Sequence, residues 1–251
     1  MDRKVPKKFS LAITSIKGLA KRERYLAAFL FGSIVRGEVT DESDLDAKVV
    51  VNDESCENIN HPFVGGVKLD ITFLSFRQLE DLLEQQKAKQ ERIPMLAESI
   101  ILFDKTGKLG KLKKKYAKVK PKKYTKKDFQ YLRYMLYHSD EKVKKAMKKG
   151  RTEAELALLM NFRSLIREHY RIHGRWYRGD KRLLNDLAQW DKLFGRIIKR
   201  FIAEKDFTRK YELWFKMIQH VSRPLGGFQR IEDNNCDCKA CSKDLAMLMG
   251  D

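Results

Sequence analysis

Three aspartates and a glycine–serine pair form the part of the sequence best suited to chemistry. The apolar run 26–31 leads directly into Gly32 and Ser33, and Asp44 and Asp46 follow after a polar loop. Glycine lets the backbone approach a phosphate closely, and a helix beginning at Ser33 would offer free N–H groups and a hydroxyl to an anion. We therefore predict a phosphate-binding turn at Gly32 and Ser33.

The aspartates are spaced to bind metal ions. Asp44 and Asp46 lie two residues apart on a segment expected to be extended, so both carboxylates should project from one face. Asp70 lies within the apolar run 67–74, where an unpaired charge is costly. If the two segments are neighbouring strands, the three carboxylates surround a pocket beside the phosphate-binding turn. Two Mg²⁺ ions held there would bridge the phosphates of a nucleotide and activate an acceptor hydroxyl.

A larger set of residues matches a known family in order and spacing: Gly32-Ser33, Arg36-Gly37, Ser43-Asp44-x-Asp46 and Asp70. The set resembles the DNA polymerase β-like nucleotidyltransferase superfamily, and within it the small prokaryotic branch that includes aminoglycoside- and lincosamide-type antibiotic nucleotidyltransferases. The resemblance implies that Asp44 and Asp46 bind both Mg²⁺ ions and that Asp70 completes one metal site and helps to activate the acceptor. It also implies an NTP donor, for which ATP is our expectation.

Nucleotide binding is assigned to Gly32, Ser33 and Arg36 on the same resemblance. One residue departs from the family pattern. Lys48 lies in the strand after the aspartate pair, where apolar residues are more usual, and it can pair with a phosphate or face solvent.

The elements that must hold these residues alternate between helix and strand over the first hundred residues. Apolar periodicity predicts, in order, a helix at 8–24, strands at 26–31, 45–51 and 67–74, a helix at 76–89 and a strand at 100–103. After residue 108 the strand signals stop, and helices are predicted at 125–148, 152–173, 181–203 and 206–221.

These patterns predict the fold class and the domains. We expect an α+β (α/β-like) nucleotidyltransferase domain with a mixed sheet, followed by an all-α helical bundle domain. The expected bounds are a first domain at 1–107, a Lys-rich linker at 108–124, a helical bundle at 125–224 and a Cys-containing tail at 225–251.

The net charge of +19 is unevenly distributed. Residues 1–107 carry 16 Lys and Arg against 17 Asp and Glu, whereas residues 108–149 carry 17 against 3. Like charges repel, so a polycationic acceptor such as an aminoglycoside is disfavoured, and RNA stays open as a partner. A homodimer also stays open.

Composition indicates a cytoplasmic protein. No apolar run approaches the roughly 18–20 residues that a membrane span needs, and no secretory leader is recognisable. Cys236, Cys238 and Cys241 crowd together near the C-terminus, far from Cys56, which suits a reducing compartment. Their spacing is close to that of zinc ligands, but a tetrahedral site needs a fourth ligand, so we favour a reduced tail without zinc.

Two further patterns lie in the helical region. His169 and His173 are spaced i, i+4, which can hold a metal, but we favour side chains that line a groove or face water. Arginines at near-helical spacing alternate with aromatic residues, a pattern that fits either a solvated basic face or phosphate binding with base stacking. The set comprises Arg163, Arg167, Arg171, Arg175 and Arg178 with Tyr170, Trp176 and Tyr177.

The sequence therefore predicts a Mg²⁺-dependent nucleotidyltransferase that moves a nucleoside monophosphate, AMP from ATP, onto a hydroxyl of a small-molecule or protein acceptor. One alternative is a template-independent RNA nucleotidyltransferase, which the basic segment would suit. Another is a non-catalytic nucleotide sensor or the nucleotide-transferring antitoxin of a toxin pair.

Overall fold

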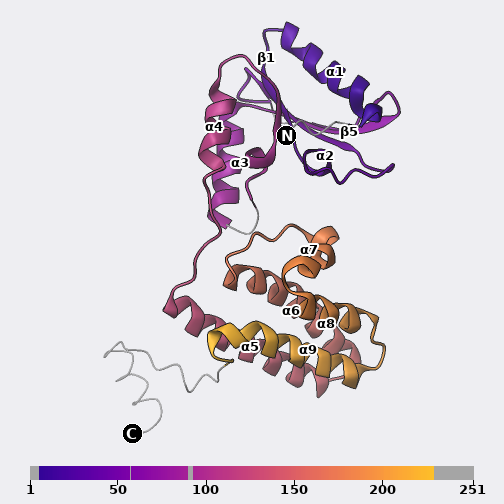
Figure 1. The fold of residues 1–251 in the computed structure, drawn as a ribbon, viewed down its shortest axis with the longest axis vertical. Helices are drawn as coiled ribbons and strands as arrows, with labels where there is room; N and C mark the ends of the chain where they lie inside the picture. Colours follow the sequence, from indigo (N-terminus) through magenta and orange to yellow (C-terminus); the bar gives the residue numbers. More distant parts are fainter. Residues whose placement is uncertain (1–5, 57, 90–92, 229–251) are drawn as a thin grey trace. The chain divides into compact units, whose positions relative to one another are not determined.

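The chain consists of two compact units, and the boundary between them in the sequence lies between Pro121 and Lys122. The computed structural model describes residues 6–56, 58–89 and 93–228 (Figure 1). The first unit contains a mixed sheet flanked by helices, and the second is helical. The expected fold class, an α+β unit followed by an all-α unit, is confirmed.

The sheet of the first unit has the strand order β3-β5-β2-β1-β6, with β4 paired to β5. β2 and β5 run parallel, and the other pairs are antiparallel. The strands are β1 (Tyr25–Leu30), β2 (Leu45–Val51), β3 (Asn58–Asn60), β4 (Phe63–Val64), β5 (Val67–Leu74) and β6 (Ile100–Asp104). The predicted strands at 26–31, 45–51, 67–74 and 100–103 correspond to β1, β2, β5 and β6, whereas β3 and β4 were not predicted.

Helices cover both faces of this sheet (Figure 1). The helical elements of the unit are η1 (Lys7–Phe9), α1 (Ser10–Gly18), η2 (Leu19–Lys21), α2 (Ser33–Arg36), α3 (Phe76–Lys89), η3 (Met95–Glu98) and α4 (Lys108–Tyr116). Successive side chains of a strand point to opposite faces. Leu45, Ala47 and Val49 of β2 accordingly pack in the cluster that contains α1, while Val50 packs in the cluster that contains α3 and α4.

The Lys-rich segment expected as a linker at 108–124 is a helix in its first half. α4 buries Leu109, Leu112 and Tyr116, which are spaced three and four residues apart and so share one helix face. Each buried side chain of this size contributes about 1.5–3 kcal/mol. The lysines of α4 lie around the apolar stripe, and the prediction of a linker over these residues was wrong because their charge hid the periodicity.

The second unit is a helical bundle. Its elements are α5 (Lys126–Met147), α6 (Arg151–Ile172), η4 (Asp180–Arg182), α7 (Leu183–Trp190), α8 (Lys192–Ala203), α9 (Phe207–Ser222) and η5 (Arg223–Leu225). A capping box joins Thr125 and Asp128 at the start of α5. Trp214 of α9 is completely buried in the core.

The single helix predicted at 181–203 is wrong, because it is broken at Asp191. This residue leaves the helical conformation, with φ −143° and ψ 73°, and ends α7. Its Oδ1 accepts a hydrogen bond from the backbone N–H of Phe194 at 3.0 Å, so it also caps α8. The break turns the carboxylate of Asp191 into the bundle.

Among the residues that the structure describes, no helix combines the length and the apolar character needed to cross a membrane.

Candidate functional site

Asp46 and Asp70 face each other across the parallel pair β2 and β5. The two residues are direct partners in the register of the strands. Paired residues of neighbouring strands are about 4.8 Å apart at the backbone and point to the same face of the sheet. Both carboxylates therefore project from the face that carries α3 and α4, since Leu69 and Ile71 on either side of Asp70 pack in the α1 cluster. Asp70 lies on the predicted strand, but its side chain is 41% exposed rather than buried.

Gly32 lies directly beneath the carboxylate of Asp46. Its backbone has φ +77° and ψ −146°, which glycine adopts readily and other residues rarely do. A Cβ at this position would lie 1.7 Å from Oδ2 of Asp46 and 2.7 Å from its Cγ. The neighbouring Phe31 N–H donates to the carbonyl of Asp46 at 3.1 Å, so this backbone contact continues the sheet. Only glycine leaves room for the carboxylate here.

The predicted short helix begins at Ser33. α2 spans Ser33–Arg36 and ends at Gly37, which is left-handed with φ +74°. Ile34 and Val35 are buried in the α1 cluster and fix the helix to the sheet. Arg36 Nε lies 3.5 Å from Oε2 of Glu38, and about a third of its side chain is exposed (34%).

Asp44 is placed by a turn just before β2 begins. The backbone N–H of Thr40 donates to Oγ of Ser43 at 2.8 Å, and the N–H of Ser43 donates to the carbonyl of Thr40 at 3.1 Å. Lys8 Nζ donates to the carbonyls of Thr40 and Asp41 at 2.6 and 3.0 Å. Asp44 follows this anchored turn, two residues from Asp46, and is partly buried.

Lys48 does not face solvent. It is 8% exposed and lies on the same strand face as Asp46, with Nζ 5.6 Å from the centre of the Phe31 ring. It is paired across the sheet with Phe29 on one side and Thr72 on the other. A buried ammonium group on this face brings positive charge close to the aspartates.

The structure adds His61, which the sequence gave no reason to select. This residue lies between β3 and β4, and its Nδ1 is 3.9 Å from Oδ1 of Asp70. The antiparallel pairing of β3 with β5 ends at Asn60 opposite Ile71, which places the next residue, His61, beside Asp70. Both side chains are accessible, at 52% and 41% exposure, so the contact is one between solvent-facing groups.

A cavity of about 620 Å³ lies on the other face of the sheet. Its walls include Ile16 and Leu19 near the N-terminus and Leu69, Ile71 and Phe73 of β5. These β5 residues alternate with Asp70, so they line the cavity on the sheet face opposite the carboxylate pair. His61, which lies 3.9 Å from Asp70, also lines the cavity.

The aromatic residues singled out in the second unit are largely core residues. Tyr170 and Tyr177 are 1% and 3% exposed, which leaves neither ring available for stacking on a base. Arg163 lies 3.5 Å from Asp180, and Arg175 lies over the ring of Trp190 at 4.6 Å. Burial therefore excludes the base-stacking alternative for both tyrosines.

The cysteines considered as zinc ligands, Cys236, Cys238 and Cys241, lie outside the described residues. Cys56 is described and is a free, partly buried cysteine.

Comparison with known proteins agrees with the geometry of the first unit. Residues 14–107 match a family described as polymerase beta, nucleotidyltransferase. The chain is also similar to a nucleotidyltransferase-like protein from Exiguobacterium sibiricum 255-15, with 13% identity, a TM-score of 0.48 and coverage of 85% of this chain and 73% of that one. No curated protein matches the chain. With its matched segment spanning every strand and the Gly32 turn, the first unit belongs to the DNA polymerase β-like nucleotidyltransferase superfamily.

Proposed function

We propose that the protein is a Mg²⁺-dependent nucleotidyltransferase that transfers a nucleoside monophosphate, AMP from ATP, onto a hydroxyl of a small-molecule or protein acceptor. The observation that carries the proposal is the register pairing of Asp46 with Asp70, with Gly32 directly beneath Asp46. The family of the first unit supports nucleotidyl transfer as the general reaction.

The residues present fit a pair of hard divalent cations. Asp46 and Asp70 offer carboxylate oxygens from one sheet face, and Asp44 offers another two residues before Asp46. Gly32 provides a backbone surface that a Cβ would fill, so a ligand held by Asp46 can also reach the chain at this turn. Asp44, Asp46 and Asp70 would hold the ions. When bound, these would neutralise phosphate charge and lower the pKa of an acceptor hydroxyl.

The protein's own groups position the donor and manage the proton. Gly32 and Ser33 would contact the triphosphate through the backbone and the hydroxyl, and Arg36 would add a positive charge at the end of α2. The acceptor hydroxyl would lie at Asp70. As its oxygen bonds to the α-phosphorus and the bond to the leaving pyrophosphate breaks, Oδ1 of Asp70 can take up the hydroxyl proton. His61 Nδ1, 3.9 Å from that oxygen, or solvent can then receive the proton.

Charge narrows the acceptor class. The chain carries a net charge of +19, and the segment 108–149 is its most basic part. A polycationic acceptor would be repelled, so neutral or anionic small molecules and protein hydroxyls are the acceptors that the charge favours.

A label-transfer experiment tests the proposal. The full chain is incubated with each of the four NTPs, labelled at the α-phosphate, with and without Mg²⁺, and with three acceptor classes: small hydroxyl compounds, protein and RNA. We expect Mg²⁺-dependent transfer from ATP to a small molecule or protein, abolished by Asp46→Asn. Transfer to RNA alone would replace the proposal with the RNA nucleotidyltransferase. Absence of transfer together with Mg²⁺-dependent ATP binding would favour the sensor or antitoxin alternative.

A further inference from the structure

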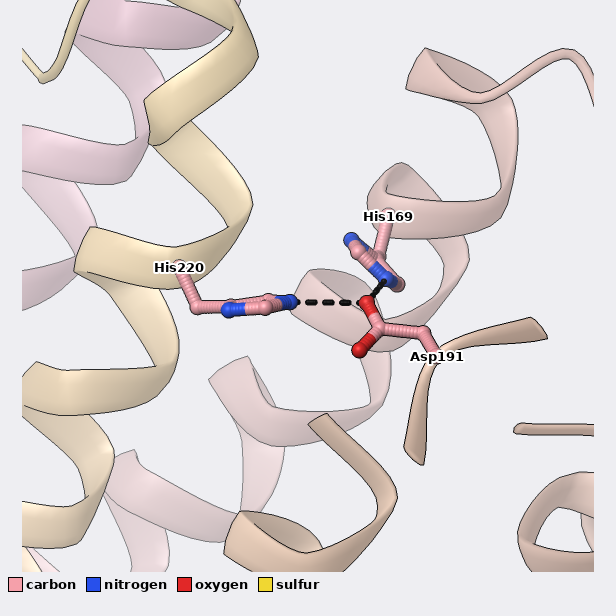
Figure 2. Close-up of side chains that lie close together, drawn as sticks. All are labelled: His169, Asp191 and His220. Atoms are coloured by element: carbon pink, nitrogen blue, oxygen red, sulfur yellow. Dashed lines mark hydrogen bonds and ion pairs between the residues drawn. The ribbon is translucent and has the colours of Figure 1, made fainter. Parts of the chain in front are cut away.

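Two histidines and an aspartate meet inside the helical unit, in a cluster that nucleotidyl transfer does not use. His169 comes from α6, Asp191 from the break between α7 and α8, and His220 from α9 (Figure 2). Both imidazoles donate from Nε2 to the same oxygen, Oδ2 of Asp191, at 2.8 Å for His169 and 2.7 Å for His220. The two ring nitrogens and the carboxylate oxygen lie within 4.8 Å of one another.

The surroundings of the cluster are aromatic and largely closed to water. The side chain of His169 is fully buried, whereas Asp191 and His220 remain 13% and 21% exposed. Trp190 stacks on His169 with the ring centres 5.0 Å apart, and Phe194 stacks on His220 at 5.3 Å. A metal site needs ligands that are positioned by packing on rigid elements, and it needs an opening through which the ion can enter. The cluster has both features.

We propose that His169, Asp191 and His220 bind one divalent transition-metal ion of the zinc type. Two imidazole nitrogens and one carboxylate oxygen form a donor set that suits zinc and its neighbours rather than Mg²⁺, which prefers oxygen ligands. The proposal does not depend on nucleotidyl transfer, because the cluster and the aspartates of the first unit belong to separate units.

The donor spacing is compatible with such an ion. Zinc bonds of about 2.0–2.1 Å in tetrahedral geometry place donor atoms about 3.4 Å apart. The N–O separations of 2.7 and 2.8 Å would open by about 0.6 Å to reach that value, a movement that side-chain rotation can supply. The exposed edge at Asp191 and His220 leaves room for water as a fourth ligand.

The orientation of the ligands also suits the ion. Nδ1 of His169 has no hydrogen-bond partner within the described part of the chain, so the hydrogen bond from Nε2 to Asp191 is the one that orients this ring. Oδ1 of Asp191 is held by the N–H of Phe194, an outer contact that orients the carboxylate.

His173, the residue that follows the last residue of α6, provides a matched control. It lies one turn after His169, is exposed, and its Nδ1 donates to the carbonyl of His169 at 2.9 Å. The i, i+4 spacing of His169 and His173 therefore does not form the cluster. His220 and Asp191, distant in sequence, supply the partners instead.

The test is a metal titration of the full chain in which all four cysteines are replaced by serine, with excess Mg²⁺ to occupy oxygen sites. Co²⁺ is followed by its visible absorption, and Zn²⁺ by competition with a chromophoric chelator. We expect one equivalent of either metal to bind. His220→Phe keeps the ring stack on Phe194 but removes the nitrogen donor, and should weaken binding by more than about 100-fold. His173→Gln removes a neighbouring ring but no donor atom of the cluster, so it should change the affinity far less than His220→Phe does.

A second variant keeps the proposal falsifiable if His220→Phe fails to fold. Asp191→Asn retains an oxygen to cap α8 but loses the negative charge, and should weaken Zn²⁺ binding at least tenfold. Folding is checked in each variant by far-UV circular dichroism, because Trp190 stacks on His169 and its fluorescence would respond to changes in the cluster itself. The proposal is overturned if the cysteine-free chain binds neither metal, or if folded His220→Phe or Asp191→Asn binds Zn²⁺ as tightly as that chain. The cluster would then be a hydrogen-bond network only.

Discussion

Replacing Gly32 by alanine adds a single methyl group at the point where β1 leads into α2. The methyl carbon would lie 1.7 Å from Oδ2 of Asp46, so the carboxylate must move by about 1.5 Å or more to reach van der Waals distance. A misplacement of about 1 Å in a catalytic group can reduce turnover about 100-fold. We therefore expect Gly32→Ala to reduce nucleotidyl transfer by at least about 100-fold.

Stability should change much less than turnover. The backbone conformation of Gly32 costs a residue with a side chain about 1–3 kcal/mol, and the colliding group is the movable end of a side chain. Turnover is measured as pyrophosphate release, and unfolding by urea with far-UV circular dichroism. Gly107→Ala is the matched control, because Gly107 also has a positive φ of 69° but a Cβ there meets nothing within 4 Å.

The outcome that would refute this reasoning is a Gly32→Ala protein with turnover close to that of the unmodified chain. The carboxylate of Asp46 would then tolerate displacement, and its position over Gly32 would have no part in catalysis. Equal losses of turnover in Gly32→Ala and Gly107→Ala would also refute it, since backbone strain alone would explain the effect.

Two predictions concern the packing of each unit. Hydrogen bonds from Lys115 and Tyr116 lower the pKa of Glu84 to about 2. The stabilisation of the folded state by these hydrogen bonds is therefore present above about pH 4.5 and is lost as the pH falls towards 2. The difference in urea midpoint between the unmodified chain and Glu84→Gln should shrink from pH 6 to pH 3. Asp140 is buried and accepts from the hydroxyl of Tyr211 at 2.9 Å, so Asp140→Ala should destabilise the helical unit by about 1–3 kcal/mol, measured by tryptophan fluorescence, and an unchanged midpoint would contradict the structure.

The main elements of the site could be predicted from the sequence because their signals are local. β2 and β5 are largely apolar segments that carry Asp46 and Asp70, and Gly32 follows the apolar run 26–31 directly. The parallel pairing of β2 with β5 sets Asp46 opposite Asp70. No short stretch of the sequence indicates this register, because it depends on packing between distant segments. The same holds for His61, which reaches Asp70 through the short strands β3 and β4.

The helical unit shows where periodicity misleads. The buried apolar residues of α7 and α8 are spaced as if on one continuous helix: Leu183, Leu187, Phe194 and Ile198. Apolar periodicity therefore gives no indication of the break at Asp191. A capping signal was present, since aspartate is a favoured N-cap residue. The meeting of Asp191 with His169 and His220 depends on that break and on the packing of three helices, which one sequence does not reveal.

The most direct test of the central claim is a thermal-unfolding titration with ATP, with and without Mg²⁺, on the unmodified chain beside Asp46→Asn. A ligand that binds only the folded protein raises the melting temperature by mass action. The account predicts a Mg²⁺-dependent rise in the unmodified chain and none in a folded Asp46→Asn variant. An equal Mg²⁺-dependent rise in both proteins would contradict the assignment of the metal–nucleotide site to these carboxylates.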